Sequence, residues 1–383
     1  MARVLLVVLA LLLLFFSVVP ALVDRALNRV AGAKPPAPSE RAEALFTTLR
    51  VVDLHADPLL WQRDLGRRLA HGQVDLPRLV EGNVALQVFG IVTQSPAGQN
   101  FERNEADAPD TITLLVVAQR WPLATWRSRL ARAEHQAAKL DALAAQSDGR
   151  LAVIRDAAGL QSFLAARERD PARVAGLLAI EGAQALDGTL AGLERLFAAG
   201  VRMIGLAHFF DNPVAGSSAG VAKHGLTPLG REVVERMQAL GVAIDLAHVS
   251  PAAVADTLAL ATKPVVVSHT GVQATCPGPR NLSDEQIRAV AATGGVIGIA
   301  YFEGAVCGAD VGHIVRAMRH VKDLVGAQHL ALGSDFDGAV TTAFDTTGLA
   351  AIVDGLLADG WRDDEIRGAM GENALRVLAQ TLP

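Results

Sequence analysis

Cysteine is scarce in this sequence, and so is any surplus of positive charge. The 383 residues include only two cysteines, Cys276 and Cys307, which excludes a disulfide-dense scaffold and a metal site built from thiolates. Lysine and arginine total 35 against 40 aspartates and glutamates, without a basic block. This balance provides no basic surface of the kind that binds nucleic acid. With 51% hydrophobic residues the chain can bury a large core. Because there are only two cysteines, any metal must be held mainly by histidines and carboxylates.

Charge is also missing from the N-terminal run of residues 4–23, which is almost wholly apolar. A helix of about 20 residues, rising about 1.5 Å per residue, spans the hydrocarbon core of a bilayer. We therefore predict a membrane segment over residues 1–25. We favour an uncleaved anchor, while the small residues of Val19-Pro20-Ala21 leave open its removal as a signal peptide.

Two features of the sequence give opposite indications of the side of the membrane on which the globular part lies. Arg25, Arg29 and Lys34 outnumber Arg3 and the terminal amine, which would keep the globular part in the cytoplasm. An N-terminal export signal followed by one large domain favours the exported side instead, periplasmic or extracellular, and we choose that side.

The rest of the chain divides into a linker and one domain. Residues 26–40 include the stretch AGAKPPAPSE, whose proline and alanine content predicts a stiff, solvated tether. No second linker or low-complexity block follows, so residues 41–383 are predicted to form one large domain.

Eight short apolar runs alternate with helical patterns in this domain, one of them opened by a capping box of Ser283 and Gln286. No glycine-rich phosphate loop follows the first run, which disfavours an open doubly wound sheet. Eight parallel strands with crossover helices predict an α/β fold of the closed (β/α)8 TIM-barrel type. A longer helical insert, roughly residues 107–164, separates the second run from the third. The runs are residues 51–54, 84–92, 177–180, 203–207, 242–246, 264–267, 296–300 and 330–332.

Histidines and carboxylates stand where six of these runs end. In a parallel barrel the carboxyl ends of the strands form one catalytic rim, so these groups should converge on a single pocket. A single histidine at a strand end is more often structural, but seven such groups on one rim are hard to explain by packing. The seven are His55, Asp57, Glu181, His208, His248, His269 and Asp335.

The residue types suit zinc in a catalytic site with an open position, and they disfavour calcium. His55 and Asp57 lie two residues apart, so an extended strand places both side chains on one face. They could share one ion with Glu181, while His248 and His269 hold a second ion that Glu181 bridges. Two ions about 3.5–4 Å apart would lower the pKa of a clamped water towards about 7 and give hydroxide at neutral pH.

Seven segments in chain order resemble the membrane dipeptidase (renal dipeptidase-like) family of zinc metallopeptidases, within the amidohydrolase-type barrels. Such a match over nearly the whole domain is more specific than the His-x-Asp pair alone. The segments are DLHAD at 53–57, IEG at 180–182, LAH at 206–208, IDLAHVS at 244–250, VSH at 267–269, PRNL at 279–282 and GSDFDG at 333–338.

The resemblance implies zinc-dependent hydrolysis of dipeptides by the bridging hydroxide, with Glu181 bridging two zinc ions per chain. His208 would stabilise the oxyanion, Asp335 would relay the proton to the leaving amine, and Arg280 would bind the C-terminal carboxylate of the substrate. Asp337 is an alternative to Asp335 for this proton-relay role, because strand alternation puts both side chains on one face. We favour Asp335, which is nearer to the strand. The resemblance also implies tolerance of a D-residue at the second position of the dipeptide, and a homodimer.

The two cysteines follow the sixth and seventh runs, so their loops should emerge on the same rim, where the thiols could pair or remain free. The resemblance implies that Cys276 and Cys307 form a disulfide, which requires an oxidising compartment and supports export.

Two other functions stay open. An amidohydrolase of the same fold could act on a lactam or an N-acyl amino acid. An inactive membrane-tethered binding module would require degraded ligands, and none of the metal-site and acid/base positions is degraded.

Overall fold

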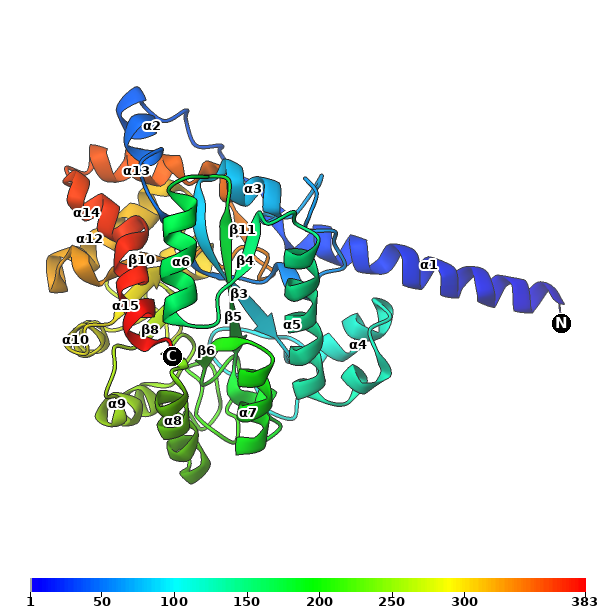
Figure 1. Cartoon of the computed structure of the whole chain (residues 1–383). Helices are drawn as coiled ribbons and strands as arrows, with labels where there is room; N and C mark the ends of the chain where they lie inside the picture. The colour runs from blue at the N-terminus through cyan, green and yellow to red at the C-terminus, as the bar shows by residue number, and fades with distance from the viewer. Residues whose placement is uncertain (1) are drawn as a thin grey trace.

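Eight parallel strands close into a barrel in the computed structural model, which describes residues 2–383 apart from the side chains of residues 2 and 6–13. The spatial order is β3-β2-β10-β9-β8-β7-β6-β5, and a pairing of β3 with β5 completes the ring. The predicted TIM-type barrel is therefore confirmed (Figure 1). Its strands are β2 (Val51–Ala56), β3 (Val84–Val92), β5 (Val174–Glu181), β6 (Val201–Gly205), β7 (Ala243–Asp245), β8 (Val266–Thr270), β9 (Val296–Ile299) and β10 (Leu330–Leu332).

The strands are buried on both faces, which is why they appear in the sequence as nearly continuous apolar runs. Side chains near the strand starts, such as Val52, Leu86 and Val296, share one cluster with Leu375 and Leu378 of the last helix, α15 (Asn373–Thr381). That helix therefore helps to fill the end of the barrel where the strands begin. The end where the strands finish is left for the functional groups.

Helices surround the barrel in the expected alternation (Figure 1). The predicted capping box is present at the start of α10 (Asp284–Ala292). The predicted insert contains α4 (Thr111–Ala118), α5 (Arg129–Ala145), the short strand β4 (Leu151–Val153) and the first part of α6 (Ala157–Arg167). The other helices are α2 (Glu40–Phe46), α3 (Leu76–Glu81), α7 (Leu190–Ala198), α8 (Pro228–Leu240), α9 (Pro251–Leu260), α11 (Glu303–Val306), α12 (Val311–Val325), α13 (Ala350–Ala358) and α14 (Asp363–Arg367).

The N-terminal run forms helix α1 (Ala2–Leu27), which projects from the barrel with its C-terminal end against it (Figure 1). Within the described part of the chain, no helix meets the length and hydropathy expected of a membrane span. The side chains of residues 6–13, in the middle of the predicted membrane segment, lie outside that part, so the prediction is not confirmed.

The beginning of the predicted tether is attached to the barrel rather than free. Directly after α1, strand β1 (Arg29–Val30) pairs in parallel with β11 (Thr341–Thr342), which belongs to the segment after β10. Asn28 is buried, and its side-chain oxygen accepts a hydrogen bond from the Ala339 amide at 2.9 Å. The fixed part of the chain therefore extends back into α1.

Candidate metal centre

All seven predicted groups meet at the carboxyl ends of the barrel strands, with Glu181 at the centre. Glu181 Oε1 lies 3.1 Å from His248 Nε2, 3.3 Å from His269 Nε2 and 3.7 Å from His55 Nε2. Its other oxygen, Oε2, lies 3.3 Å from His208 Nε2. One carboxylate therefore faces four imidazoles that come from four different strands or the loops after them.

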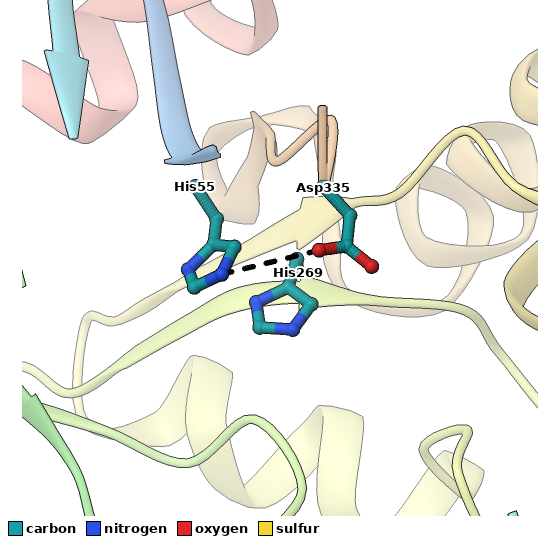
Figure 2. A group of neighbouring side chains, drawn as sticks. All are labelled: His55, His269 and Asp335. Atoms are coloured by element: carbon teal, nitrogen blue, oxygen red, sulfur yellow. Dashed lines mark ion pairs between the residues drawn. The ribbon is translucent and has the colours of Figure 1, made fainter. Parts of the chain in front are cut away.

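The two remaining carboxylates approach the same cluster from the side of His55. The Nε2 atom of His55 lies 3.2 Å from Asp57 Oδ2 and 3.9 Å from Asp335 Oδ1. Figure 2 shows His55, His269 and Asp335 side by side, with the imidazoles of His55 and His269 stacked at a centroid distance of 3.8 Å. Three carboxylates thus share a buried space a few ångströms across.

This concentration of negative charge perturbs the groups around it. Burial raises the pKa of Glu181 well above its usual value, and the charge of Asp57 raises it further. Burial likewise raises the pKa of Asp335 to about 7, against the opposing effect of His55. Burial lowers the pKa of His55, but Asp57, Glu181 and Asp335 outweigh it and raise that pKa to about 10. The pocket therefore favours a positive charge among its carboxylates.

The polar atoms of the cluster fit a bound metal. His55 Nε2 and Asp57 Oδ1 are buried and have no hydrogen-bond partner in the structure, although buried polar groups are nearly always paired. Three sets of ligand atoms lie within 4.8 Å of one another, and their nitrogen and oxygen donors suit a borderline divalent ion such as zinc. The sets are His55 with Asp57 and Glu181, Glu181 with His208 and His248, and His55 with His269 and Asp335.

A hydrogen-bonded chain behind His269 sets the direction of its imidazole. Ser268 Oγ lies 2.8 Å from His269 Nδ1 and 2.5 Å from Asp245 Oδ2. Because the serine proton goes to the carboxylate, Ser268 accepts from Nδ1–H, which leaves the Nε2 lone pair directed at Glu181. Partners of this kind fix the tautomer and raise the basicity of a metal-binding histidine.

A second aspartate–serine pair holds the His55 side of the pocket. Ser334 donates its amide to Asp53 Oδ1 at 2.8 Å and its hydroxyl to Asp53 Oδ2 at 2.6 Å. This joins the middle of β2 to the turn after β10, and so sets His55 beside Asp335. Asp53 and Asp245 were not predicted as site residues. The available signal was a carboxylate within a buried apolar strand, two or three residues before a histidine.

A glycine on β3 makes room for two of the ligands. A Cβ atom on Gly90 would lie 2.2 Å from Asp57 Oδ1 and 2.8 Å from His55 Cε1. Gly90 was not among the predicted site residues, although glycine inside a β-branched run often marks a close approach of another group.

Two of the site residues have left-handed backbones. His248 has φ of 64° and Asp335 has φ of 62°, a region that non-glycine residues seldom adopt and that is often found at functional sites. The expected strand alternation that would put Asp337 on the face of Asp335 is wrong, because β10 already ends at Leu332. Asp337 instead accepts hydrogen bonds from Arg63 Nη1 at 2.7 Å and the Gln73 amide at 2.9 Å, away from the metal cluster.

Arg280 is buried beside the cluster, and part of its guanidinium has no hydrogen-bond partner. Its Nη2 donates to the His269 carbonyl at 2.8 Å, while Nε and Nη1 have no partner. Arg280 lines a cavity of about 410 Å³ together with Asp57, Glu181 and His208. The loop that carries it is linked to the end of α11 by a disulfide between Cys276 and Cys307.

Comparisons with known proteins agree with this geometry. A family profile described as membrane dipeptidase, peptidase family M19, matches residues 39–382. The "Uncharacterized protein in pqqA 5'region" of Klebsiella pneumoniae is 36% identical over 63% of this chain and 93% of its own length. Dipeptidase 3 of Mus musculus is 27% identical over 82% of this chain and 64% of its own length.

Two solved structures are similar over almost their entire length. A metallopeptidase from Rhodobacter sphaeroides, bound to a phosphinate mimic of the dipeptide L-Ala-D-Ala, has a TM-score of 0.69, 25% identity and coverage of 87% of this chain and 99% of its own. A family M19 dipeptidase has a TM-score of 0.69, 27% identity and coverage of 88% of this chain and 99% of its own.

Proposed function

The chain belongs to the membrane dipeptidase family, peptidase family M19, and from that premise we propose that it is a dizinc dipeptidase. The family is one of metal-dependent peptide-bond hydrolases. The observation that carries the proposal is the convergence of His55, His248 and His269 on one oxygen of Glu181. His55, Asp57 and Glu181 would hold one zinc ion, and Glu181, His248 and His269 would hold the other.

When bound, the two ions would supply Lewis acidity towards the peptide carbonyl and lower the pKa of the attacking water. Asp335 is suited to moving a proton towards the leaving amine, because burial raises its pKa to about 7 and it can therefore both hold and release a proton near neutrality. Burial lowers the pKa of His208 to about 3, so its imidazole is neutral, and the tautomer with the proton on Nε2, the atom that faces Glu181, could donate an N–H to the developing oxyanion.

Arg280 supports the choice of dipeptides as the substrate class. Arg280 lines a cavity that also contains the ligand cluster, and its Nε and Nη1 have no partner, so a free C-terminal carboxylate could accept a charge-assisted hydrogen bond from its guanidinium. A longer peptide has no carboxylate at that place. The L-Ala-D-Ala mimic bound by the Rhodobacter sphaeroides relative supports tolerance of a D-residue at the second position.

The proposal includes a membrane anchor. The apolar run of residues 4–23 is long enough to serve as one, and the Cys276–Cys307 disulfide fits an exported domain in an oxidising compartment.

Metal analysis and kinetics test the proposal together. The purified protein should contain about two zinc ions per chain, and Glu181→Ala should remove both. Ala-D-Ala should be hydrolysed, and Arg280→Ala should lower kcat/KM for it by about 100-fold, the effect of losing a charge-assisted hydrogen bond. A C-terminally amidated dipeptide should be a poor substrate for both the wild type and the Arg280→Ala variant. Turnover of N-acyl amino acids without turnover of dipeptides would instead favour the amidohydrolase alternative.

A further inference from the structure

The last turns of α1 form part of the wall of the cavity that contains the metal cluster. Val23 and Leu27 line the same space as Glu181 and Arg280. Leu27 is 42% exposed, as expected for a residue at the mouth of a cavity. The C-terminal end of α1, where the predicted membrane segment ends, is therefore in position to contact a bound substrate.

Buried ion pairs hold this end of the helix in place. Arg63 donates from Nε to Asp24 Oδ2 at 2.7 Å and from Nη1 to Asp337 Oδ2 at 2.7 Å. All three side chains are nearly inaccessible to solvent, and charge-assisted hydrogen bonds in such a setting are short and strong. Asp24 on α1 is thereby tied to the turn after β10 that also carries Asp335. This arrangement holds the end of α1 that carries Val23 and Leu27 against the barrel.

The wall that includes these two residues is apolar. Val23 and Leu115 of α4 pack against a cluster that contains Trp61 and Ile112, and all four residues line the cavity. A cavity of about 410 Å³ falls within the range of about 300–1,000 Å³ typical of ligand sites. A substrate with a large apolar group can remove this surface from water, whereas a small side chain leaves it wet.

Arg280 fixes which end of a dipeptide would reach this wall. Arg280 belongs to the loop after β8, whereas α1 is tied to Arg63, which follows β2. Strands β10 and β9 separate β2 from β8 in the sheet, so the loop of Arg280 and the attachment point of α1 enter the rim at different places. With its carboxylate at Arg280, a dipeptide would extend its N-terminal residue towards α1.

We propose that Val23 and Leu27 determine substrate specificity, and that the chain prefers dipeptides with a bulky apolar N-terminal side chain. This proposal rests on the proposed function and adds the substrate preference. It also makes α1 a part of the active site as well as the proposed anchor.

The test compares Leu-Ala with Ala-Ala in the full-length, zinc-loaded protein. Val23→Ser should lower the ratio of kcat/KM for Leu-Ala to that for Ala-Ala by about tenfold, mainly through KM, as expected for lost apolar contact in a pocket. Val23→Trp, which fills the space, should lower the same ratio. The matched control is Leu22→Ser, which changes a 56% exposed neighbour on the same helix and should leave the ratio unchanged.

Binding of phosphinate mimics of Leu-Ala and Ala-Ala, measured by calorimetry, separates this proposal from the proposed function. Weaker binding of the Leu-Ala mimic to Val23→Ser, with no shift in Leu22→Ser, supports the specificity role even if the protein hydrolyses no dipeptide. Dipeptide turnover with the same Leu-Ala preference in wild type and both Val23 variants would overturn the specificity role and leave the proposed function standing. An equal shift in Leu22→Ser would also overturn it.

Discussion

His248 and His269 bring their Nε2 atoms within 3.0 Å of each other. Burial lowers the pKa of both histidines well below the usual value, and the positive charge of Arg280 lowers it further for His248. Both imidazoles are thus neutral, and His269 already uses Nδ1–H towards Ser268, so its Nε2 presents a lone pair. Two neutral histidines that converge beside a carboxylate form a site prepared for a cation.

Removal of the metal should destabilise the protein. Without a cation, the carboxylates of Asp57, Glu181 and Asp335 repel one another in a buried space, whereas an ion that binds only the folded state stabilises it. A metal at about 100 times its Kd contributes about 2.7 kcal/mol. Thermal melting with EDTA should show a lower Tm that is restored by added zinc. An identical melting curve with and without EDTA would argue against a metal in this cluster.

Ser268→Ala should weaken metal binding without unfolding the barrel. The substitution breaks the link from Asp245 to His269 Nδ1, and loss of such a supporting partner typically costs about 10–100-fold in metal affinity. Competition with a zinc chelator measures the change. Ser147→Ala is the control, because it removes a buried hydroxyl that bonds only to nearby backbone far from the cluster. Equal zinc affinity in both variants would contradict a positioning role for Ser268.

Gly90→Ala should displace two predicted ligands. The added methyl group would overlap Asp57 Oδ1 and the His55 ring, so we expect at least one of the two zinc ions to be lost. Gly176→Ala on β5 is the control, because its methyl group would meet only the edge of Phe89 at 3.1 Å and Leu140 at 3.3 Å. Zinc content per folded protein distinguishes the two variants. A fully loaded Gly90→Ala protein would show that this site can move to accommodate a methyl group.

Stability should rise with pH between about 7 and the unfolded-state lysine pKa of about 10.4, because of Lys139. Burial, with a further effect from Arg63, lowers the pKa of Lys139 to about 7. The folded state therefore releases the proton at a lower pH than the unfolded state does. Within this window the unfolded state binds more protons, so the free energy of unfolding increases with pH.

Urea unfolding at pH 7 and pH 10 measures this dependence. Lys139 Nζ donates to the Trp61 carbonyl at 2.8 Å, and a neutral amine can keep that bond. Lys139→Met should flatten the rise in stability between the two pH values. The same rise in wild type and variant would assign the effect to another group.

The sequence by itself determined the barrel and the chemical identity of its site. Parallel strands buried on both faces must be apolar throughout, so the eight runs and the polar residues after them, from His55 to Asp335, could be recognised without coordinates. Parallel strands also have all their carboxyl ends on one rim, which made the convergence of these groups on one pocket predictable from chain order alone.

Only the tertiary structure decided which neighbouring groups support that site. Ser334 holds Asp53, Arg63 joins Asp24 to Asp337, and Gly90 makes room for Asp57, all through contacts between residues far apart in the chain. Asp337 turned away from Asp335 because a left-handed turn replaced the expected strand. Local sequence patterns encode periodicity and strand ends, but they do not encode the direction of a side chain after a turn or its partner across the fold. For the same reason the sequence marked α1 only as a membrane segment, whereas packing against α4 and Arg63 made it a wall of the cavity.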